Sequence, residues 1–178
     1  MVVAVVNLGF LGTSFCTGSL IAQRWVLTAA HCEADPFITS VLVGTERVYA
    51  NVLGEVFFVD GRQIRVSDAY NHPMYNFDDP FRRAHDIALL RLDRSADSSS
   101  FMRINLLSDQ PVQASMARVS GFGKTIFQVE EPEDTEGFLR QVDIPVFPDD
   151  RCEEVYPNEV LFDRQVCAGY ASLECGSW

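Results

Sequence analysis

A histidine stands beside a cysteine in the segment WVLTAAHC, residues 25–32, where an apolar run gives way to small residues. An imidazole can act as a general base when a second group holds its ring in one tautomer and one direction. The small residues Thr28, Ala29 and Ala30 allow other backbone to pack closely around His31. An isolated histidine is more often a structural residue, so a catalytic interpretation of His31 requires a partner.

The candidate partner is Asp86, which opens the segment DIALLRL. A carboxylate directly before a wholly apolar strand is either solvated at the strand end or buried, and a buried carboxylate needs hydrogen-bond donors. A histidine N–H group is such a donor. Spacing in the sequence does not show that His31 and Asp86 meet, so the residues alone leave the structural and the catalytic interpretation open.

The cysteines suit disulfide bonds better than a metal site. Five cysteines stand at positions 16, 32, 152, 167 and 175, with no C-x-x-C pair and no histidine cluster at metal-ligand spacing. We therefore expect no metal and no other cofactor. Cys16 with Cys32, and Cys152 with Cys167, are similarly spaced and would suit disulfide-closed loops in an oxidising compartment. Cys175 is left over, either as a buried inert thiol or as one whose partner is absent from these residues.

The composition indicates a globular protein and argues against two classes of partner. The chain has 178 residues, of which 47% are hydrophobic and 22% charged, enough for one sizeable core or two small ones. Its formal net charge of -11 would be repelled by nucleic acids and by anionic membranes, so we expect neither as a partner. The apolar run Val2–Val6 is far too short to span a bilayer, and no positive region precedes it as in a signal peptide.

Short apolar or alternating runs recur along the chain and predict strands, because Gly, Pro, Asn and Asp residues separate them. The predicted strands cover residues 2–8, 15–21, 25–29, 41–43, 56–59, 64–66, 87–92, 118–120 and 139–146. Only residues 149–156 predict a helix, since capping-type aspartates follow a proline and the segment stops before the next proline. The sequence thus predicts an all-β protein with one short helix.

Two polar segments lie between these runs. DRSADSSSF, residues 93–101, is rich in serine and predicts a linker between two subdomains, residues 1–95 and 96–178. EEPEDTE, residues 130–136, holds five acidic residues out of seven. We interpret it as a solvated loop that repels itself into an open shape, with capture of a basic partner as the alternative.

Taken together, the motifs resemble the chymotrypsin and trypsin family of serine endopeptidases. GSLIAQRWVLTAAHC resembles the histidine region of that family, and DIALLRL resembles its aspartate motif. Three further segments resemble the family in the family's order: NHPMYN at 71–76, VSGFGKT at 119–125 and VCAGY at 166–170. The resemblance implies that His31 is the general base and acid, and that Asp86 orients its ring and stabilises the imidazolium.

The resemblance also implies a fold, disulfide bonds and a location. It implies two six-stranded antiparallel barrels in one trypsin-like domain, with a short intermediate helix and the catalytic residues in the cleft between the barrels. Cys16–Cys32 matches the family's bridge beside the catalytic histidine, and Cys152–Cys167 matches the bridge after the intermediate helix. Cys175 would pair with a cysteine beyond residue 178. We expect an extracellular protein, although the chain itself shows no signal peptide.

The chain departs from the family pattern at both ends. The family's serine nucleophile lies in a GDSGGP motif that also supplies the oxyanion hole, whereas these residues end in CGSW. Nothing in the sequence would fix Ser177 near His31, so we do not expect it to be the nucleophile. The family's Ile-Val-Gly-Gly type N-terminus is missing as well. We therefore expect a truncated chain, inactive as written, with a nearly complete first barrel and an incomplete second barrel.

Three functional hypotheses remain at this stage. The first is a serine endopeptidase that acts on protein or peptide substrates, of which this chain is an incomplete product. The second is a catalytically dead homologue that binds or inhibits another protein, and the third is a fragment without a function of its own. The intact motifs around His31 and Asp86 favour the first hypothesis, and the missing nucleophile favours the second. Substrate preference, target, activation and oligomeric state are not determined by these residues.

Overall fold

The structure is a computed structural model that describes residues 1–9, 12–32, 35, 37, 39–50, 56–76, 78, 84–96, 116–122, 137–155 and 166–169. The chain divides into two compact units. Unit 1 comprises residues 1–104 and 121–140, and unit 2 comprises residues 105–120 and 141–178. The boundary expected near residue 95 stays a prediction.

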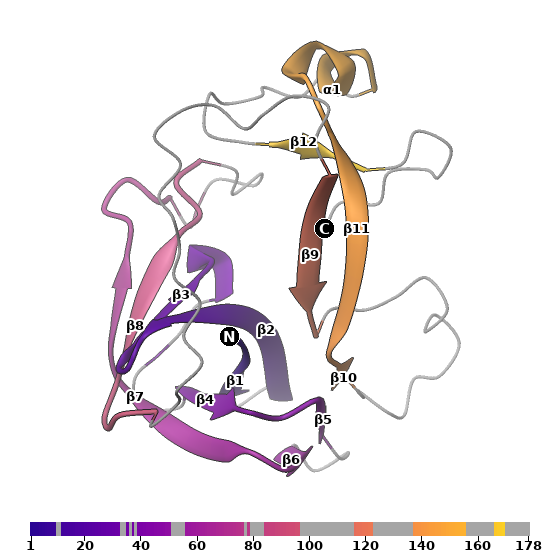
Figure 1. Cartoon of the computed structure of the whole chain (residues 1–178). Coiled ribbons are helices and arrows are strands. Elements are labelled where there is room, and N and C mark those ends of the chain that lie inside the picture. The colour runs from indigo at the N-terminus through magenta and orange to yellow at the C-terminus, as the bar shows by residue number, and fades with distance from the viewer. Residues whose placement is uncertain are drawn as a thin grey trace. The chain divides into compact units, whose positions relative to one another are not determined.

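Unit 1 contains a closed antiparallel barrel of six strands (Figure 1). Around the barrel the order is β1 (Val2–Gly9), β2 (Gly12–Ala22), β3 (Trp25–Thr28), β8 (Ala88–Leu92), β7 (Arg62–Asn71) and β4 (Thr39–Val43), and β4 pairs with β1. Closure leaves no strand of this sheet with an unpaired edge. The predicted all-β fold is confirmed, and its first barrel is present with six strands.

Aliphatic side chains from all six strands fill the barrel. The buried members of this cluster are Val3, Val5, Leu20, Val26, Val41, Val43, Ile64, Val66, Leu90, Leu92 and Ala96. Strand β1 is buried on both faces, because Val3 and Val5 point into the barrel whereas Ala4 and Val6 join a second cluster with Leu42. Burial on both faces explains why residues 2–6 of β1 are continuously apolar instead of alternating.

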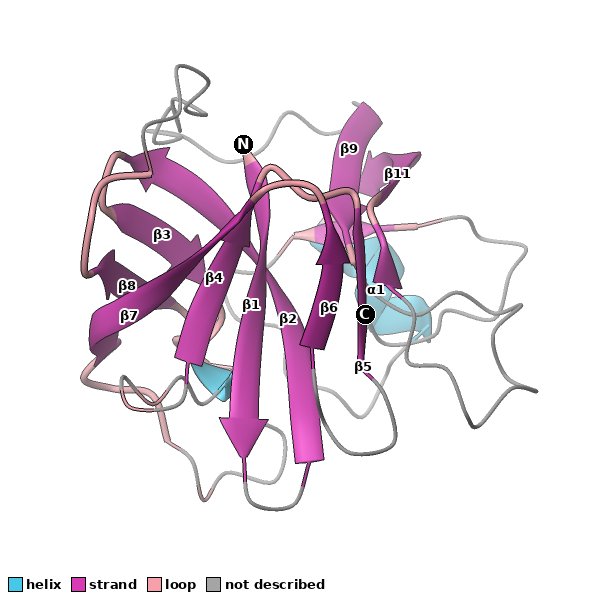
Figure 2. Ribbon diagram, turned by 90° about the horizontal axis from the view of Figure 1, so that it is seen from below, coloured by secondary structure: helices cyan, strands magenta, loops and turns pink. Residues whose placement is uncertain are grey.

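A second sheet of unit 1 packs against the outward-facing side chains of β1 and β4. Its strand order is β10 (Gly137–Phe138), β5 (Arg47–Ala50) and β6 (Val56–Val59). Figure 2 shows its strands β5 and β6 beside β1 and β2. Val48 and Phe58 from this sheet pack in the cluster that holds Ala4 and Val6. The sequence predicted β6 with its observed bounds but omitted β5 and β10.

Unit 2 supplies most of a third sheet, in the order β12 (Cys167–Ala168), β11 (Arg140–Phe147) and β9 (Met116–Gly121). Helix α1 (Asp149–Val155) follows β11 and confirms the predicted helix, although residue 156 lies outside the described part of the chain. No helix among the described residues is both long and apolar enough to cross a membrane.

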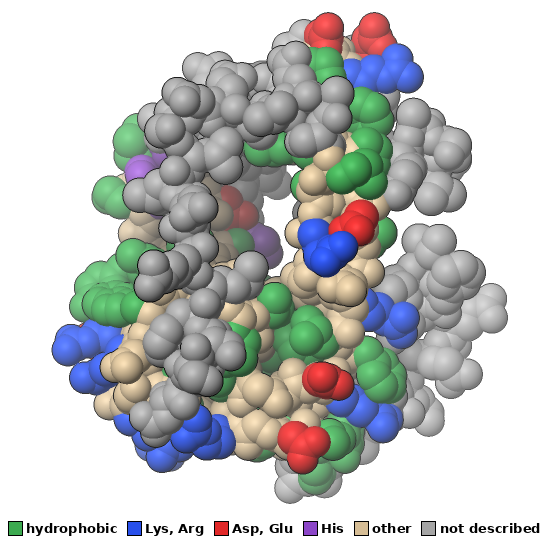
Figure 3. Space-filling model, viewed as in Figure 1, with side chains coloured by type: hydrophobic (Ala, Val, Ile, Leu, Met, Phe, Trp, Pro, Cys, Tyr) green, Lys and Arg blue, Asp and Glu red, His purple; other side chains and the backbone are tan. Residues whose placement is uncertain are grey.

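An ion pair links two strands of this third sheet. The Arg118 Nε donates to Asp143 Oδ1 at 2.7 Å, and the Arg118 Nη2 donates to Asp143 Oδ2 at 2.9 Å. Acidic and basic side chains accordingly lie side by side over β9 and β11 (Figure 3). The ion pair thus joins β9 to β11. Within the described residues, unit 2 contributes to a sheet of three strands, which falls short of a closed barrel.

The first residues of the predicted linker belong to the barrel of unit 1. The Asp93 N–H donates to the Arg65 carbonyl at 3.0 Å, and the Ala96 N–H donates to the Gln23 carbonyl at 2.8 Å. Ala96 is fully buried in the barrel core. The remaining linker residues 97–101 and the acidic segment 130–136 lie outside the described residues.

Candidate active site

Strand pairing brings His31 and Asp86 to the same end of the barrel. The last residue pair between β3 and β8 is Thr28 opposite Ala88. Because the two strands are antiparallel, the residues that follow Thr28 lie beside those that precede Ala88. The 3-10 turn Ala30–Cys32 follows β3 directly and carries His31. This register places Asp86, two positions before β8, next to His31, three positions after β3.

His31 contacts the Asp86 carboxylate through its backbone and through its ring. The His31 N–H donates to Asp86 Oδ1 at 2.8 Å, and His31 Nδ1 lies 2.6 Å from Asp86 Oδ2. An ionised carboxylate can only accept hydrogen bonds, so the ring proton sits on Nδ1 and Nε2 is the atom left to accept a proton. The His31 side chain is 52% exposed and the Asp86 side chain 24%. The ring is therefore fixed in tautomer and direction while remaining open to solvent.

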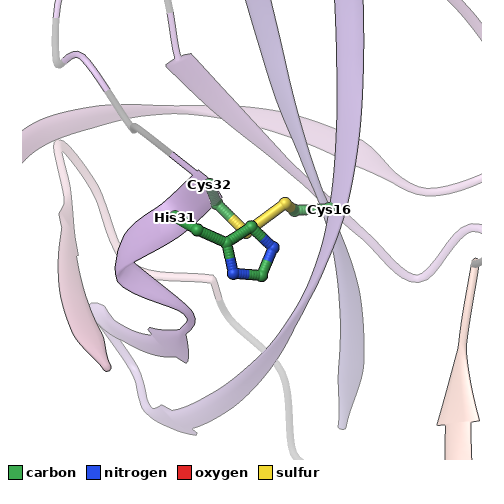
Figure 4. Close-up of side chains that lie close together, drawn as sticks. All are labelled: Cys16, His31 and Cys32. Carbon is green, nitrogen blue, oxygen red and sulfur yellow. A yellow bond between two sulfur atoms is a disulfide. The ribbon is translucent and has the colours of Figure 1, made fainter. Parts of the chain in front are cut away.

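A disulfide bond fixes the turn that carries His31. Cys32 is bonded to Cys16 of β2, with the two Cα atoms 6.1 Å apart, and the His31 ring lies beside this disulfide (Figure 4). A bridge that closes a loop of this length stabilises the folded chain by about 3 kcal/mol. The second predicted bridge, Cys152–Cys167, is also present and joins α1 to β12. Cys175 lies outside the described residues.

The same three side chains form the one group of possible metal ligands found among the described residues. The ligand atoms of Cys16, His31 and Cys32 all lie within 4.8 Å of one another. Cysteine binds metal ions as the thiolate, and both sulfur atoms here are joined in the disulfide. In this oxidised form the group offers a metal ion only the imidazole.

A buried asparagine, which the sequence analysis did not recognise as part of the site, anchors the same turn. The Asn7 Nδ2 donates to the Cys32 carbonyl at 2.6 Å, and the Thr39 hydroxyl donates to Asn7 Oδ1 at 2.7 Å. Asn7 is only 7% exposed. The signal in the sequence was a single polar residue within the apolar run of β1, because a buried amide requires hydrogen-bond partners.

Two alanines close to the pair in the chain are buried in one cluster. Ala30 and Ala88, which flank His31 and Asp86 in the chain, are buried together with Tyr75. Tyr75 comes from the segment 71–76, which resembles the family in sequence. The small side chains allow the ends of β3 and β8 to approach closely, as the sequence predicted for the alanines before His31.

Comparison with known proteins identifies the family of the chain. The sequence model of the family described as Trypsin matches residues 2–176 of the chain. The chain belongs to the trypsin family. It is 30% identical over 155 residues to kallikrein-8 of Mus musculus, and 32% identical over 172 residues to a trypsin of Simulium vittatum. These matches cover 86% and 94% of the chain.

The chain spans only part of these relatives. It covers 55% of the mouse kallikrein-8 and 62% of the Simulium vittatum trypsin. Among solved structures it resembles neuropsin, a serine protease expressed in the limbic system of mouse brain. That match has a TM-score of 0.70 and 27% identity, and covers 96% of this chain and 69% of the other.

Three residues were considered for catalysis: His31, Asp86 and Ser177. The structure brings the first two together and does not describe the third. His31 and Asp86 are in direct contact, and both lie in unit 1. Ser177 lies outside the described residues. The catalytic roles of His31 and Asp86 stay predictions.

Proposed function

We propose that this chain is the histidine- and aspartate-bearing part of a serine endopeptidase, an enzyme that hydrolyses peptide bonds in proteins. The observation that carries the proposal is the two-point contact between His31 and Asp86. Membership of the trypsin family supports the reaction class, since serine, histidine and aspartate act together in that family.

The geometry suits His31 for proton transfer. With Nδ1–H donated to Asp86, the Nε2 atom can take the proton of a serine hydroxyl as that oxygen attacks the peptide carbonyl carbon. The proton then passes from Nε2 to the leaving amine, and the same atom serves again when water hydrolyses the acyl-enzyme. The negative carboxylate of Asp86 stabilises the imidazolium in both steps, without itself taking the proton.

The proposal includes the kind of substrate and the location. Relatives named as trypsin and kallikrein support protein or peptide substrates for this chain. Two disulfide bonds support an oxidising compartment, and we propose that the protein is extracellular.

The 178 residues contain no GDSGGP-type segment. A triad without its nucleophile loses most of its catalytic power, because the three residues act as a unit. We therefore propose that the polypeptide of residues 1–178 does not hydrolyse peptides by itself.

A catalytically inactive homologue that binds another protein is the second candidate. Residues 1–178 by themselves leave this candidate open, since they contain no GDSGGP-type segment. The fold does not decide between the two candidates, since an inactivated protease paralogue of the scabies mite shares it, with a TM-score of 0.70 at 23% identity. The retained His31–Asp86 contact favours the enzyme, because binding alone does not require it.

The test starts with the full transcript, sequenced across both ends of the coding region, and expression of its complete product. We expect hydrolysis of fluorogenic peptides by the complete product and none by the polypeptide 1–178. In the family's template enzyme, replacement of the corresponding aspartate by asparagine lowers kcat about 10⁴-fold, and we expect a loss of that order for Asp86→Asn.

One control variant and two outcomes complete the test. Arg118→Gln changes a charged residue of unit 2 outside the His31–Asp86 pair and should leave kcat within about twofold of the unmodified enzyme. A complete product that cleaves no peptide but binds a protein would support the second candidate. Full activity of Asp86→Asn would reject the role given to Asp86.

A further inference from the structure

Two histidines next to the His31–Asp86 pair stack on each other. The rings of His72 and His85 have centroids 4.5 Å apart and planes inclined by only 9°. His72 follows the last residue of β7, and His85 directly precedes Asp86. The stack therefore joins the end of β7 to the residue that leads into the carboxylate.

Backbone hydrogen bonds make the segment around Asp86 a tight turn. The Ile87 N–H donates to the His85 carbonyl at 2.8 Å, and the His72 N–H donates to the Ile87 carbonyl at 3.0 Å. Asp86 thus sits at the centre of a three-residue turn that is attached to the end of β7. A change in the backbone angles of His85 would therefore change the direction in which the Asp86 side chain leaves the turn.

His85 adopts a backbone conformation that needs support. Its φ angle is +59°, in the left-handed region that residues with a Cβ rarely occupy. Such a conformation is unfavourable for a residue with a Cβ and persists when surrounding contacts hold it. The stacked ring of His72 supplies a side-chain contact of this kind.

The His72 ring is itself held in one orientation. The Met74 N–H donates to His72 Nδ1 at 3.2 Å, which places the ring proton of His72 on Nε2. The Tyr75 N–H donates to the His72 carbonyl at 2.9 Å, and Tyr75 packs with Ala30 and Ala88. His72 is therefore fixed both to its own turn and to the cluster of Tyr75 with the two alanines.

We propose that His72 is a positioning residue for Asp86: its ring supports His85, and this support holds the Asp86 carboxylate toward His31. The proposal rests on the proposed function, because it concerns how the Asp86 carboxylate is directed toward His31. The stack does not suit a shared metal ion, since the lone pairs of imidazole lie in the ring plane and two nearly parallel rings cannot both aim them at one point.

The test compares three variants of the polypeptide 1–178 by two NMR measurements. The first is hydrogen exchange of the His31 backbone N–H, which donates to Asp86 Oδ1, and the second is the far-downfield resonance of the His31 Nδ1 proton. We expect His72→Ala to speed exchange of that amide by about tenfold and to weaken the Nδ1 resonance. His72→Phe keeps an aromatic ring on His85 and should change exchange by less than about threefold.

Met74→Ala is the matched control. Its side chain is 67% exposed, and the substitution keeps the backbone N–H that the His72 ring accepts. We expect values within about twofold of the unmodified chain. If His72→Ala does not fold, His72→Leu removes the stacked ring while leaving His85 at its left-handed φ angle, and a rise in exchange is again expected.

Unchanged exchange in His72→Ala, or equal losses in His72→Ala and His72→Phe, would overturn the positioning role and leave the proposed function intact. Absence of the Nδ1 resonance from the unmodified chain would instead overturn the His31–Asp86 pair, and both proposals with it. Because neither readout requires a nucleophile, a failure to hydrolyse peptides does not affect this test.

Discussion

At the scale of single residues, the site depends on a polar side chain inside the barrel as much as on the two residues that carry the chemistry. Asn7 connects the turn of His31 to β4, through the Cys32 carbonyl and the Thr39 hydroxyl. Both hydrogen bonds are buried, so water cannot replace them when Asn7 is lost. The position of His31 is therefore set from three directions: by Asp86, by the disulfide and by Asn7.

Replacing Asn7 by alanine tests this support. Asn7→Ala removes the donor to the Cys32 carbonyl and the acceptor of the Thr39 hydroxyl, and we expect the free energy of unfolding to fall by about 2 kcal/mol. Urea denaturation measures this change. Ser14→Ala is the control, because Ser14 is exposed and lies 3.4 Å from Asn7 Nδ2, and its effect should stay within about 0.5 kcal/mol. Equal effects of the two substitutions would contradict the assigned role.

The sequence indicated the His31–Asp86 pair but not the residues that hold it in place. His31 and Asp86 could be named because their flanking motifs resemble those of a known family. Asn7 could not, since its partners lie 25 and 32 residues away and meet it only after the barrel closes. The sequence also did not show the left-handed backbone conformation of His85, because this conformation results from the turn that precedes β8.

At the scale of elements, the sequence located the strands with apolar runs and missed the ones without them. Residues 56–59 were predicted with the observed bounds, and α1 to within the described residues. Only the apolar centre of β7, residues 64–66, was predicted, because the ends of this strand are polar and exposed. Strands β10 and β12 have two residues each, which is too short for a period to show, and β5 (RVYA) lacks the continuous apolar run of β6 (VFFV). These short strands are recognised only through the strands with which they pair.

The Arg118–Asp143 pair gives a pH prediction for the third sheet. The hydrogen bond from the Arg118 guanidinium holds the pKa of the Asp143 carboxyl below its ordinary value. A carboxyl whose pKa is lower in the folded state stabilises that state above its unfolded pKa, and the contribution disappears as the pH falls through the folded pKa. Acid should therefore loosen the contact between β9 and β11.

Carboxyl NMR titration of Asp143 measures this effect. In Arg118→Gln the midpoint should move upward toward the ordinary value for aspartate, because the charged donor is gone. The effect on overall stability should be small, since both side chains are exposed to solvent and screened by it. A midpoint unchanged by the substitution would show that the pair does not form in solution.

At the scale of the whole molecule, the two units differ in how they bury apolar surface. Unit 1 holds the closed barrel with a core drawn from all six of its strands, and a second cluster covers its outer face. Among the described residues of unit 2, the buried ones are Val146 and Cys167. Residues Met116, Val119 and Val142 of its strands are exposed apolar side chains. The resemblance in sequence indicated both halves, and burial among the described residues leads us to expect the more stable structure in unit 1.

This difference predicts unequal protection from hydrogen exchange along the chain. Amides of β1, β3, β4 and β8 should exchange slowest, because a closed barrel opens only when its core is exposed to water. Amides of β9 and β11 should exchange at least about tenfold faster, since a three-stranded sheet with little buried apolar surface opens at a lower free energy. Exchange followed by mass spectrometry on the polypeptide 1–178 resolves the two sets. Equal protection would mean that the two units open together as one cooperative structure, whereas the expected order would mean that the His31–Asp86 pair is held by a barrel whose stability is its own.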